Sequence, residues 1–155
     1  MRTIFSIVNQ KGGVGKTTTA VNLATALCAT GKSCLIVDLD PQGNASTGLG
    51  VPVNNRRPGV FEVLSESVDM ADTVKSTDVN GLGLIPSTVN LSDVEKSIVK
   101  TDNKDFILKN AIESLPNEYS AIIIDCPPGL NFLTIDALAD PHTVLIPLQC
   151  ELYAL

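Results

Sequence analysis

The sequence predicts an α/β fold, with a mostly parallel, twisted sheet and helices on both of its faces. A β-branched and aromatic run at Thr3–Val8 is followed by a glycine-rich turn and by Lys16–Thr30, whose apolar residues recur at helical spacing. Two later runs, Ser33–Val37 and Ala121–Ile124, are almost continuously apolar, as strands covered on both faces are. Strands of this kind that alternate with helices are typical of βαβ units, which build parallel sheets.

The remaining elements follow from the same patterns. Gly31 is suited to end the first helix, because glycine adopts the left-handed conformation found just after many helices. Pro41–Pro58 is rich in Gly, Asn and Pro and predicts a long loop. After this loop, two strands are expected, at Leu82–Pro86 and Thr143–Pro147. Helical segments are expected at Val60–Leu64, Met70–Val74, Ser92–Val99, Phe106–Leu115 and Leu130–Ala139, and the third of these begins with a serine cap.

Length and composition favour one folded domain over residues 1–155. The chain is 44% hydrophobic and 18% charged, which excludes a disordered chain of low hydrophobicity and high charge. Its 11 Lys and Arg against 17 Asp and Glu give a net charge of −6, so a broad basic surface for nucleic acid is not expected. No apolar run approaches the length of a membrane span, which predicts a soluble, cytoplasmic protein without a membrane partner.

Several smaller features complete the outline. The chain stops at Glu151–Leu155, soon after an apolar strand and without a closing helix, so we expect a partial domain, truncated at its C-terminus. Cys28 and Cys34 lack C-x-x-C spacing and are expected to be small buried hydrophobes. Arg56 and Arg57 are expected to be solvated, and His142 to be a structural or exposed residue and not a catalytic base.

The glycine-rich turn after the first predicted strand has the residues of a phosphate-binding loop. Unpaired backbone N–H groups at a helix N-terminus carry partial positive charge, so a glycine-rich loop that wraps them around an anion binds phosphate. A lysine in such a loop places a full charge on the β and γ phosphates, and a following threonine hydroxyl binds Mg²⁺. The residues concerned are Lys11, Gly12, Gly13, Val14, Gly15, Lys16, Thr17 and Thr18, with Lys16 as that lysine and Thr17 as that hydroxyl.

The loop fits neither general glycine motif. Gln10 stands where G-x-x-x-x-G-K-[ST] requires its first glycine, and Thr18 stands where G-x-G-x-x-G requires its last. The segment K-G-G-x-G-K-T-T does resemble the deviant Walker A motif of the ParA/MinD family of ATPases. This resemblance implies a three-layer P-loop NTPase fold, ATP as substrate, Mg²⁺ as cofactor, and a role for Lys11 on the phosphates of a dimer partner.

Carboxylates follow two of the predicted strands. Asp38 and Asp40 share one face because side chains alternate along a strand, and Asp125 closes the AIII run, where a cation would compensate its charge. The segments VDLDPQGN and IIIDCPP also resemble the switch I and Walker B segments of the same family, in the same order. Asp38 and Asp125 are therefore candidate Mg²⁺ ligands, through water, and Asp40 is a candidate for orienting the attacking water.

The resemblance is to chromosome-partitioning ParA and Soj proteins in particular. It implies a slowly hydrolysing Mg·ATPase with Lys11, Lys16 and Asp40 as catalytic residues, whose ATP-dependent homodimer drives chromosome or plasmid partitioning. It further implies a stimulating ParB-like partner, with DNA contact and nucleoid association only through a segment beyond Leu155. The alternatives are a MinD-like regulator of cell division, a nucleotide-dependent binding module without hydrolysis, and an inactive truncated remnant.

Overall fold

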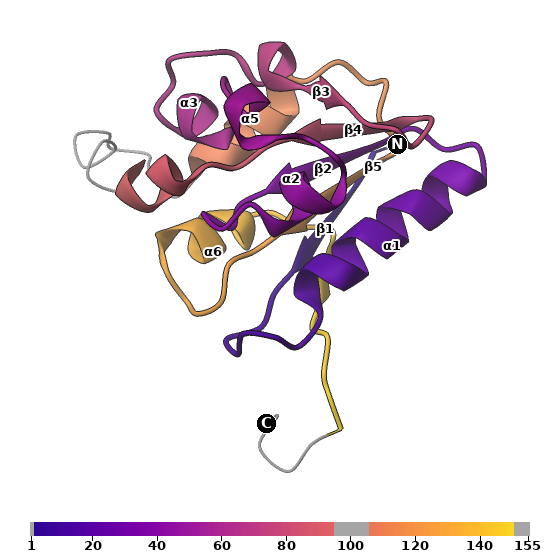
Figure 1. The fold of residues 1–155 in the computed structure, drawn as a ribbon, viewed down its shortest axis with the longest axis vertical. Helices are drawn as coiled ribbons and strands as arrows, with labels where there is room; N and C mark the ends of the chain where they lie inside the picture. The colour runs from indigo at the N-terminus through magenta and orange to yellow at the C-terminus, as the bar shows by residue number, and fades with distance from the viewer. Residues whose placement is uncertain (1, 95–105, 151–155) are drawn as a thin grey trace.

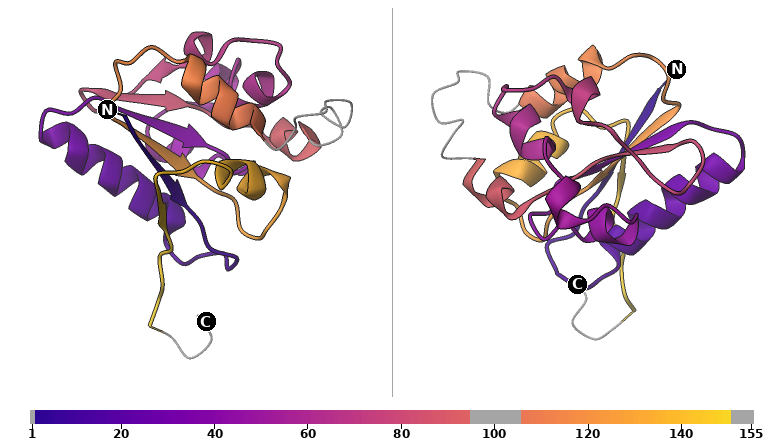
Figure 2. Two further views of the ribbon diagram at one scale, coloured as in Figure 1. Left: turned by 180° about the vertical axis from the view of Figure 1, so that it is seen from behind. Right: turned by 45° about the horizontal axis from the view of Figure 1, so that its top comes forward.

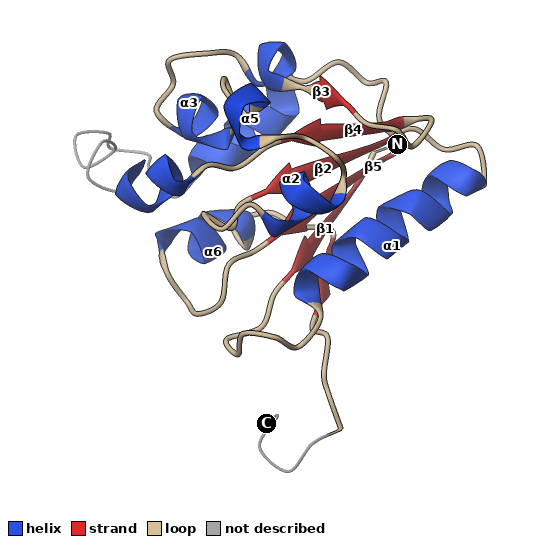
Figure 3. Ribbon diagram, viewed as in Figure 1, coloured by secondary structure: helices blue, strands red, loops and turns tan. Residues whose placement is uncertain are grey.

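A computed structural model describes residues 2–94 and 106–150 of the chain. In this part of the chain a six-stranded sheet has the order β3-β4-β2-β5-β1-β6, parallel throughout except for the pairing of β3 with β4 (Figure 3). The strands are β1 (Thr3–Ile7), β2 (Cys34–Asp38), β3 (Lys75–Ser76), β4 (Leu82–Ile85), β5 (Ala121–Asp125) and β6 (Thr143–Leu145).

Helices cover both faces of this sheet, as the sequence predicts (Figures 1 and 2). Side chains on one face of the strands pack against α1 and α2, whereas those on the other face pack against α3, α5 and α6. The α/β fold class is therefore confirmed. The helices are α1 (Lys16–Ala29), α2 (Asn44–Gly48), α3 (Val60–Leu64), α5 (Ile107–Ser114) and α6 (Phe132–Ala137), with 3-10 turns η1 (Val53–Asn55), η2 (Met70–Thr73) and η3 (Val89–Asp93).

The two central strands, β2 and β5, are buried along their whole length. Their alternation divides the core in two, because Ile36 and Ile123 face α1 while Leu35 and Ile122 face α5 and α6. Cys28 and Cys34 are buried free thiols in the first of these clusters, as expected. Because β2 and β5 run parallel and in register, their last residues, Asp38 and Asp125, lie together at the carboxyl edge of the sheet.

Two predicted elements differ from the structure. The Pro41–Pro58 segment is not all loop, since it contains α2 and η1. The predicted serine-capped helix at Ser92–Val99 instead begins as η3, in which Ser92 lies inside the turn and donates from Oγ to the Val89 carbonyl at 2.6 Å. Positions 95–99 of that prediction lie outside the described residues.

The arginine pair also differs from its prediction. Arg56 is only 5% exposed and bonded to neutral oxygens, so the expectation of a solvated side chain is wrong for it. Arg57 is exposed and pairs with Glu62, with its Nε donating to Oε1 at 2.7 Å. In the two described stretches, no helix is both long and apolar enough to cross a lipid bilayer.

Candidate functional site

The loop between β1 and α1 has the geometry of a phosphate cradle. Gly13 and Gly15 have φ values of +75° and +90°, a left-handed conformation that other residues rarely adopt. Gly15 immediately precedes α1, whose N-terminus has no side-chain cap and no acidic residue in its first turn. The first N–H groups of the helix therefore remain available to an anion, and no acidic side chain of the first helical turn caps them.

Lys16 is largely buried inside this loop. Its side chain is 7% exposed, and its Nζ donates to the Lys11 carbonyl at 2.9 Å. A buried ammonium group needs compensation, and one neutral carbonyl provides only part of it. An anion in the loop would provide the rest, which is the role predicted for the phosphates.

An open cleft of about 830 Å³ lies over the loop at the carboxyl edge of the sheet. Parallel α/β sheets bind their ligands at this edge. The cleft brings together seven predicted site residues with eight others. Its lining consists of Gly12, Gly13, Gly15, Lys16, Thr17, Thr18, Asp40, Pro41, Gln42, Asn44, Val89, Ser92, Pro127, Pro128 and Asn131. Val14 is buried beneath the loop.

Asp125 ends β5 with a carboxylate that is completely buried. Neither of its oxygens has a hydrogen-bond partner among the described residues. Burial is the main cause that raises its pKa, to about 7, and the nearby Thr17 hydroxyl and Lys16 ammonium offset only part of this effect. An orphaned anionic oxygen pair beside a hydroxyl matches the oxygen ligands that Mg²⁺ prefers.

Asp38 lies level with Asp125, because the two residues are register partners in neighbouring strands. Unlike Asp125, it is well bonded: its Oδ2 accepts from the Ser46 N–H at 2.8 Å and from the Ser46 Oγ at 2.6 Å, and its Oδ1 accepts from the Asp40 N–H at 3.2 Å. Burial still raises its pKa to about 6. This geometry makes Asp38 an anchor for α2, whereas Asp125 is better placed to hold a cation.

Asp40 is the predicted carboxylate that reaches the cleft. Its side chain is 9% exposed, and its Oδ1 accepts from the Gln42 N–H at 2.9 Å. Its carbonyl accepts from the Gly43 N–H at 2.8 Å, which closes a tight turn. Asp40 is therefore held by hydrogen bonds within its own loop, at the wall of the cleft.

Lys11 lies at the rim and not in the cleft itself. It lines a neighbouring apolar hollow of about 620 Å³ together with Leu130, Ile146 and Leu148, all more than half exposed. The segment after β6 runs beside the glycine loop (Figure 1). Two hydrogen bonds join them, from Asn9 Nδ2 to the Pro147 carbonyl at 2.8 Å and from Gln149 Nε2 to the Gly13 carbonyl at 3.2 Å.

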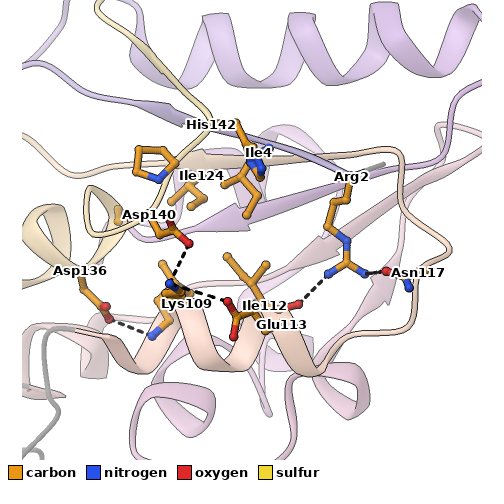
Figure 4. Close-up of a pocket in the computed structure, with 13 residues that line it drawn as sticks. Arg2, Ile4, Lys109, Ile112, Glu113, Asn117, Ile124, Asp136, Asp140 and His142 are labelled. Atoms are coloured by element: carbon orange, nitrogen blue, oxygen red, sulfur yellow. Dashed lines mark hydrogen bonds and ion pairs between the residues drawn. The ribbon is translucent and has the colours of Figure 1, made fainter.

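A second cavity, of about 330 Å³, opens beside α5 and the start of β1 (Figure 4). Its charged side chains already have partners: Lys109 Nζ pairs with Asp140 at 3.0 Å, and Arg2 Nη1 donates to the Ile112 carbonyl at 2.6 Å. His142 accepts from the Ile4 N–H through Nδ1 at 3.1 Å, so of the structural and exposed roles expected for it, this bond is a structural one. This cavity therefore offers little to a charged ligand.

Eight lining residues of the cleft were not among the candidate site residues. Five of them belong to the VDLDPQGN and IIIDCPP segments, and the other three are Val89, Ser92 and Asn131. Asn131 is the cap of α6, and its Oδ1 accepts from the Thr134 N–H at 3.1 Å. An asparagine just before a helix is a recognisable cap signal, so this residue could have been found. Val89 and Ser92 lie on η3, which reaches the cleft only through the three-dimensional fold.

The fold and the cleft together define a P-loop nucleotide-binding α/β protein, with its glycine loop between the first strand and the first helix. A family model described as an AAA domain matches residues 1–155. The chain belongs to this family, and its resemblance to the ParA/MinD group of deviant Walker A ATPases is confirmed by its relatives.

Two curated relatives illustrate the match. The sporulation initiation inhibitor protein Soj of Bacillus subtilis is 48% identical over 155 residues, which are all of this chain and 61% of Soj. The chromosome partitioning protein ParA of Myxococcus xanthus is 47% identical over 152 residues, which are 98% of this chain and 54% of ParA. The chain thus spans less than two thirds of the length of these relatives.

Solved structures agree with the fold. Cobyrinic acid a,c-diamide synthase from Mycobacterium smegmatis, with a bound ATP analogue and magnesium, has a TM-score of 0.93 at 37% identity and matches 97% of this chain and 62% of its own. A plasmid partition protein from Borrelia burgdorferi, bound to AMPPNP, has a TM-score of 0.86 at 33% identity and matches 99% of this chain and 64% of its own.

Proposed function

We propose that this chain binds Mg·ATP in the cleft over the glycine loop and hydrolyses it slowly, as part of a ParA-type partitioning ATPase. The observation that carries the proposal is the pairing of an uncapped helix N-terminus at Gly15 with the buried, unpartnered carboxylate of Asp125. The first binds an anion and the second binds a cation, so together they suit a magnesium-bound phosphate chain.

Each residue has a separate task in this proposal. Lys16 and the loop N–H groups hold the β and γ phosphates, and Thr17 and Asp125 hold Mg²⁺, with Asp38 supporting them from the next strand. Bound Mg²⁺ would neutralise charge that develops on the phosphate oxygens. Asp40 orients the attacking water. Because phosphoryl transfer depends mainly on positioning and charge neutralisation, these groups suffice for slow turnover.

Relatives named as partitioning proteins support a proposal for the wider activity. We propose that ATP drives formation of a homodimer in which Lys11 reaches the partner's phosphates, and that a ParB-like protein stimulates hydrolysis. In this proposal the whole partitioning protein is cytoplasmic and binds non-specific DNA on the nucleoid. A net charge of −6 favours such DNA contact through a local basic surface and not through these residues at large.

The direct test compares nucleotide binding and turnover in the wild type and in Lys16→Ala. The wild type should bind a labelled ATP analogue with Mg²⁺, and its specific hydrolysis rate should rise with protein concentration if dimers are the active form. Lys16→Ala should lose binding, because one buried charge on the phosphates is gone. Lys32→Ala, an exposed lysine after α1, is the matched control and should behave as wild type.

The outcomes separate the rival functions. Tight nucleotide binding without hydrolysis at any protein concentration would indicate a nucleotide-dependent binding module. If Lys16→Ala bound the ATP analogue as tightly as the wild type does, the glycine loop could not be the phosphate-binding site.

A further inference from the structure

Arg56 is a buried cation that the proposed chemistry does not use. It follows η1, is 5% exposed, and has no ion pair among the described residues. Its neighbour Arg57, by contrast, is exposed and paired with Glu62. Buried arginines are uncommon unless their N–H groups are used, so the contacts of this side chain need an explanation.

The guanidinium group of Arg56 contacts three residues of the segment from Gly43 to Val51. Its Nε donates to the Val51 carbonyl at 3.1 Å, and its Nη2 donates to the Thr47 Oγ1 at 2.7 Å. Its Nη1 lies directly against Gly43, where a Cβ atom would overlap it. The planar fork of arginine makes this multipoint contact possible, and an ammonium group could not reproduce it.

The segment that Arg56 contacts, from Gly43 to Val51, is continuous with the wall of the nucleotide cleft. Asp40 and Asn44 both line the cleft, and Gly43 lies between them. The Gly43 N–H donates to the Asp40 carbonyl at 2.8 Å, and the Thr47 N–H donates to the Gly43 carbonyl at 2.9 Å. A displacement of Gly43 is therefore transmitted to Asp40 through one backbone hydrogen bond, and a displacement of Thr47 through two.

A second anchor holds the same short helix from the side of the sheet. Ser46 donates twice to Asp38, and its Oγ accepts from the Ser87 N–H at 3.1 Å. Helix α2 has only five residues, which is too short to be stable without tertiary contacts. Its position therefore depends on the Asp38 anchor on one side and on Arg56 on the other.

We propose that Arg56 is a positioning residue for the hydrolytic reaction: its guanidinium group fixes Gly43 and Thr47 so that Asp40 faces the cleft. This inference rests on the proposed ATPase function. Arg56 touches no phosphate in this scheme, so its loss should slow turnover and leave the phosphate loop, and hence nucleotide affinity, nearly intact.

The kinetic test uses Arg56→Ala, Arg56→Lys and Thr47→Val, with Arg57→Lys as the matched control in the full chain. Arg56→Ala should lower kcat about tenfold or more while the KM for ATP changes by no more than about threefold. Arg56→Lys should be similarly slow, and added ethylguanidinium at millimolar concentration should restore part of the rate in Arg56→Ala only. Arg57→Lys should keep the wild-type rate.

Thr47→Val keeps the arginine and removes its partner hydroxyl, which guards against a variant that simply fails to fold. It should also lower kcat, because it removes the contact with Arg56 and the bond from Thr47 Oγ1 to the Gly43 carbonyl at 3.0 Å. Combining it with Arg56→Lys should cost less than the sum of the two single effects, because the contact between Arg56 and Thr47 can be lost only once. Additive effects, or a wild-type kcat in Arg56→Ala, would overturn the positioning role.

Hydrogen exchange separates this inference from the proposed function. Arg56→Ala should speed amide exchange over residues 40–48 relative to Arg57→Lys, whether or not ATP is hydrolysed. If the wild type hydrolyses no ATP, the proposed function fails. The positioning of residues 40–48 by Arg56 is then tested by hydrogen exchange alone. Unchanged exchange over residues 40–48 would overturn the inference in either case.

Discussion

Asp125 illustrates how burial of a single side chain couples folding to ligand binding. Its pKa rises from 3.8 to about 7 in the folded protein, chiefly because burial disfavours its charged form. The folded state therefore binds this proton more tightly than the unfolded state does. Its contribution is neutral below about pH 4, and the folded protein loses stability as the pH rises from there through about 7.

The corresponding prediction concerns Asp125→Asn in the presence of a chelator. The variant should unfold at higher urea concentration than the wild type, and its advantage should be on the order of 2 kcal/mol larger at pH 8 than at pH 5. Urea melts of both proteins at the two pH values provide the measurement. Mg²⁺ with nucleotide should reduce the difference by stabilising the wild type alone, and an equal advantage at both pH values would contradict the assigned cause.

Asp40 gives the sharpest separation of binding from chemistry. In Asp40→Ala the glycine loop and Thr17 are unchanged, so Mg·ATP should still bind, whereas single-turnover hydrolysis should fall by a factor of roughly 10² or more because the water is no longer oriented. Rapid mixing of excess enzyme with labelled ATP measures both quantities. A joint loss of affinity and rate would instead assign Asp40 to holding its loop, through its bond to the Gln42 N–H.

Individual residues could be predicted from sequence where their role is local. The loop from Gly12 to Thr18 is recognisable because its chemistry depends on adjacent backbone groups. The difference between Asp38 and Asp125 is not recognisable in this way, since it depends on Ser46 reaching only one of two neighbouring strand ends. The burial of Arg56 escaped prediction for the same reason, because its partners come from α2 and the loop beyond it.

At the scale of elements, α6 begins at the wall of the cleft with a capping asparagine. Asn131→Ala should destabilise the protein by about 1 kcal/mol, because the Thr134 N–H loses its acceptor, while Asn131→Asp keeps an acceptor and should be nearly neutral. Thermal melts of the three proteins under identical conditions provide the comparison. Equal losses in both variants would show that the amide group, and not the cap, is what matters.

The longer elements could be predicted because their buried residues give apolar runs or apolar residues at helical spacing in the sequence. Continuous apolar runs located β2 and β5, and helical spacing located α1 to within one residue at its C-terminus. By contrast, α2 and η3 are short and are stabilised by contacts distant in sequence, such as those of Ser46 with Asp38 and Ser87. Strand β3 has two residues and one neighbour, which is too little for any periodic signal.

At the scale of the whole molecule, Lys11 lies outside the cleft that its own loop forms. Lys11→Ala should therefore spare most nucleotide binding but suppress both ATP-dependent dimer formation and hydrolysis. Light scattering with a non-hydrolysable ATP analogue, over a range of protein concentrations, measures the dimer. A variant that dimerises as the wild type does would contradict action on a partner's phosphates.

The strand order also has a consequence for how the protein is made. Strand β1, which leads into the glycine loop, pairs with β5 and β6 and not with β2. Neither of these partners is present until more than 120 residues have been synthesised. During synthesis on the ribosome, β1 and the following segment with Lys16 therefore lack these strand partners until β5 and β6 have been made, and such pairing between distant segments slows folding. The position of the glycine loop thus depends on strands that are made more than 100 residues after it.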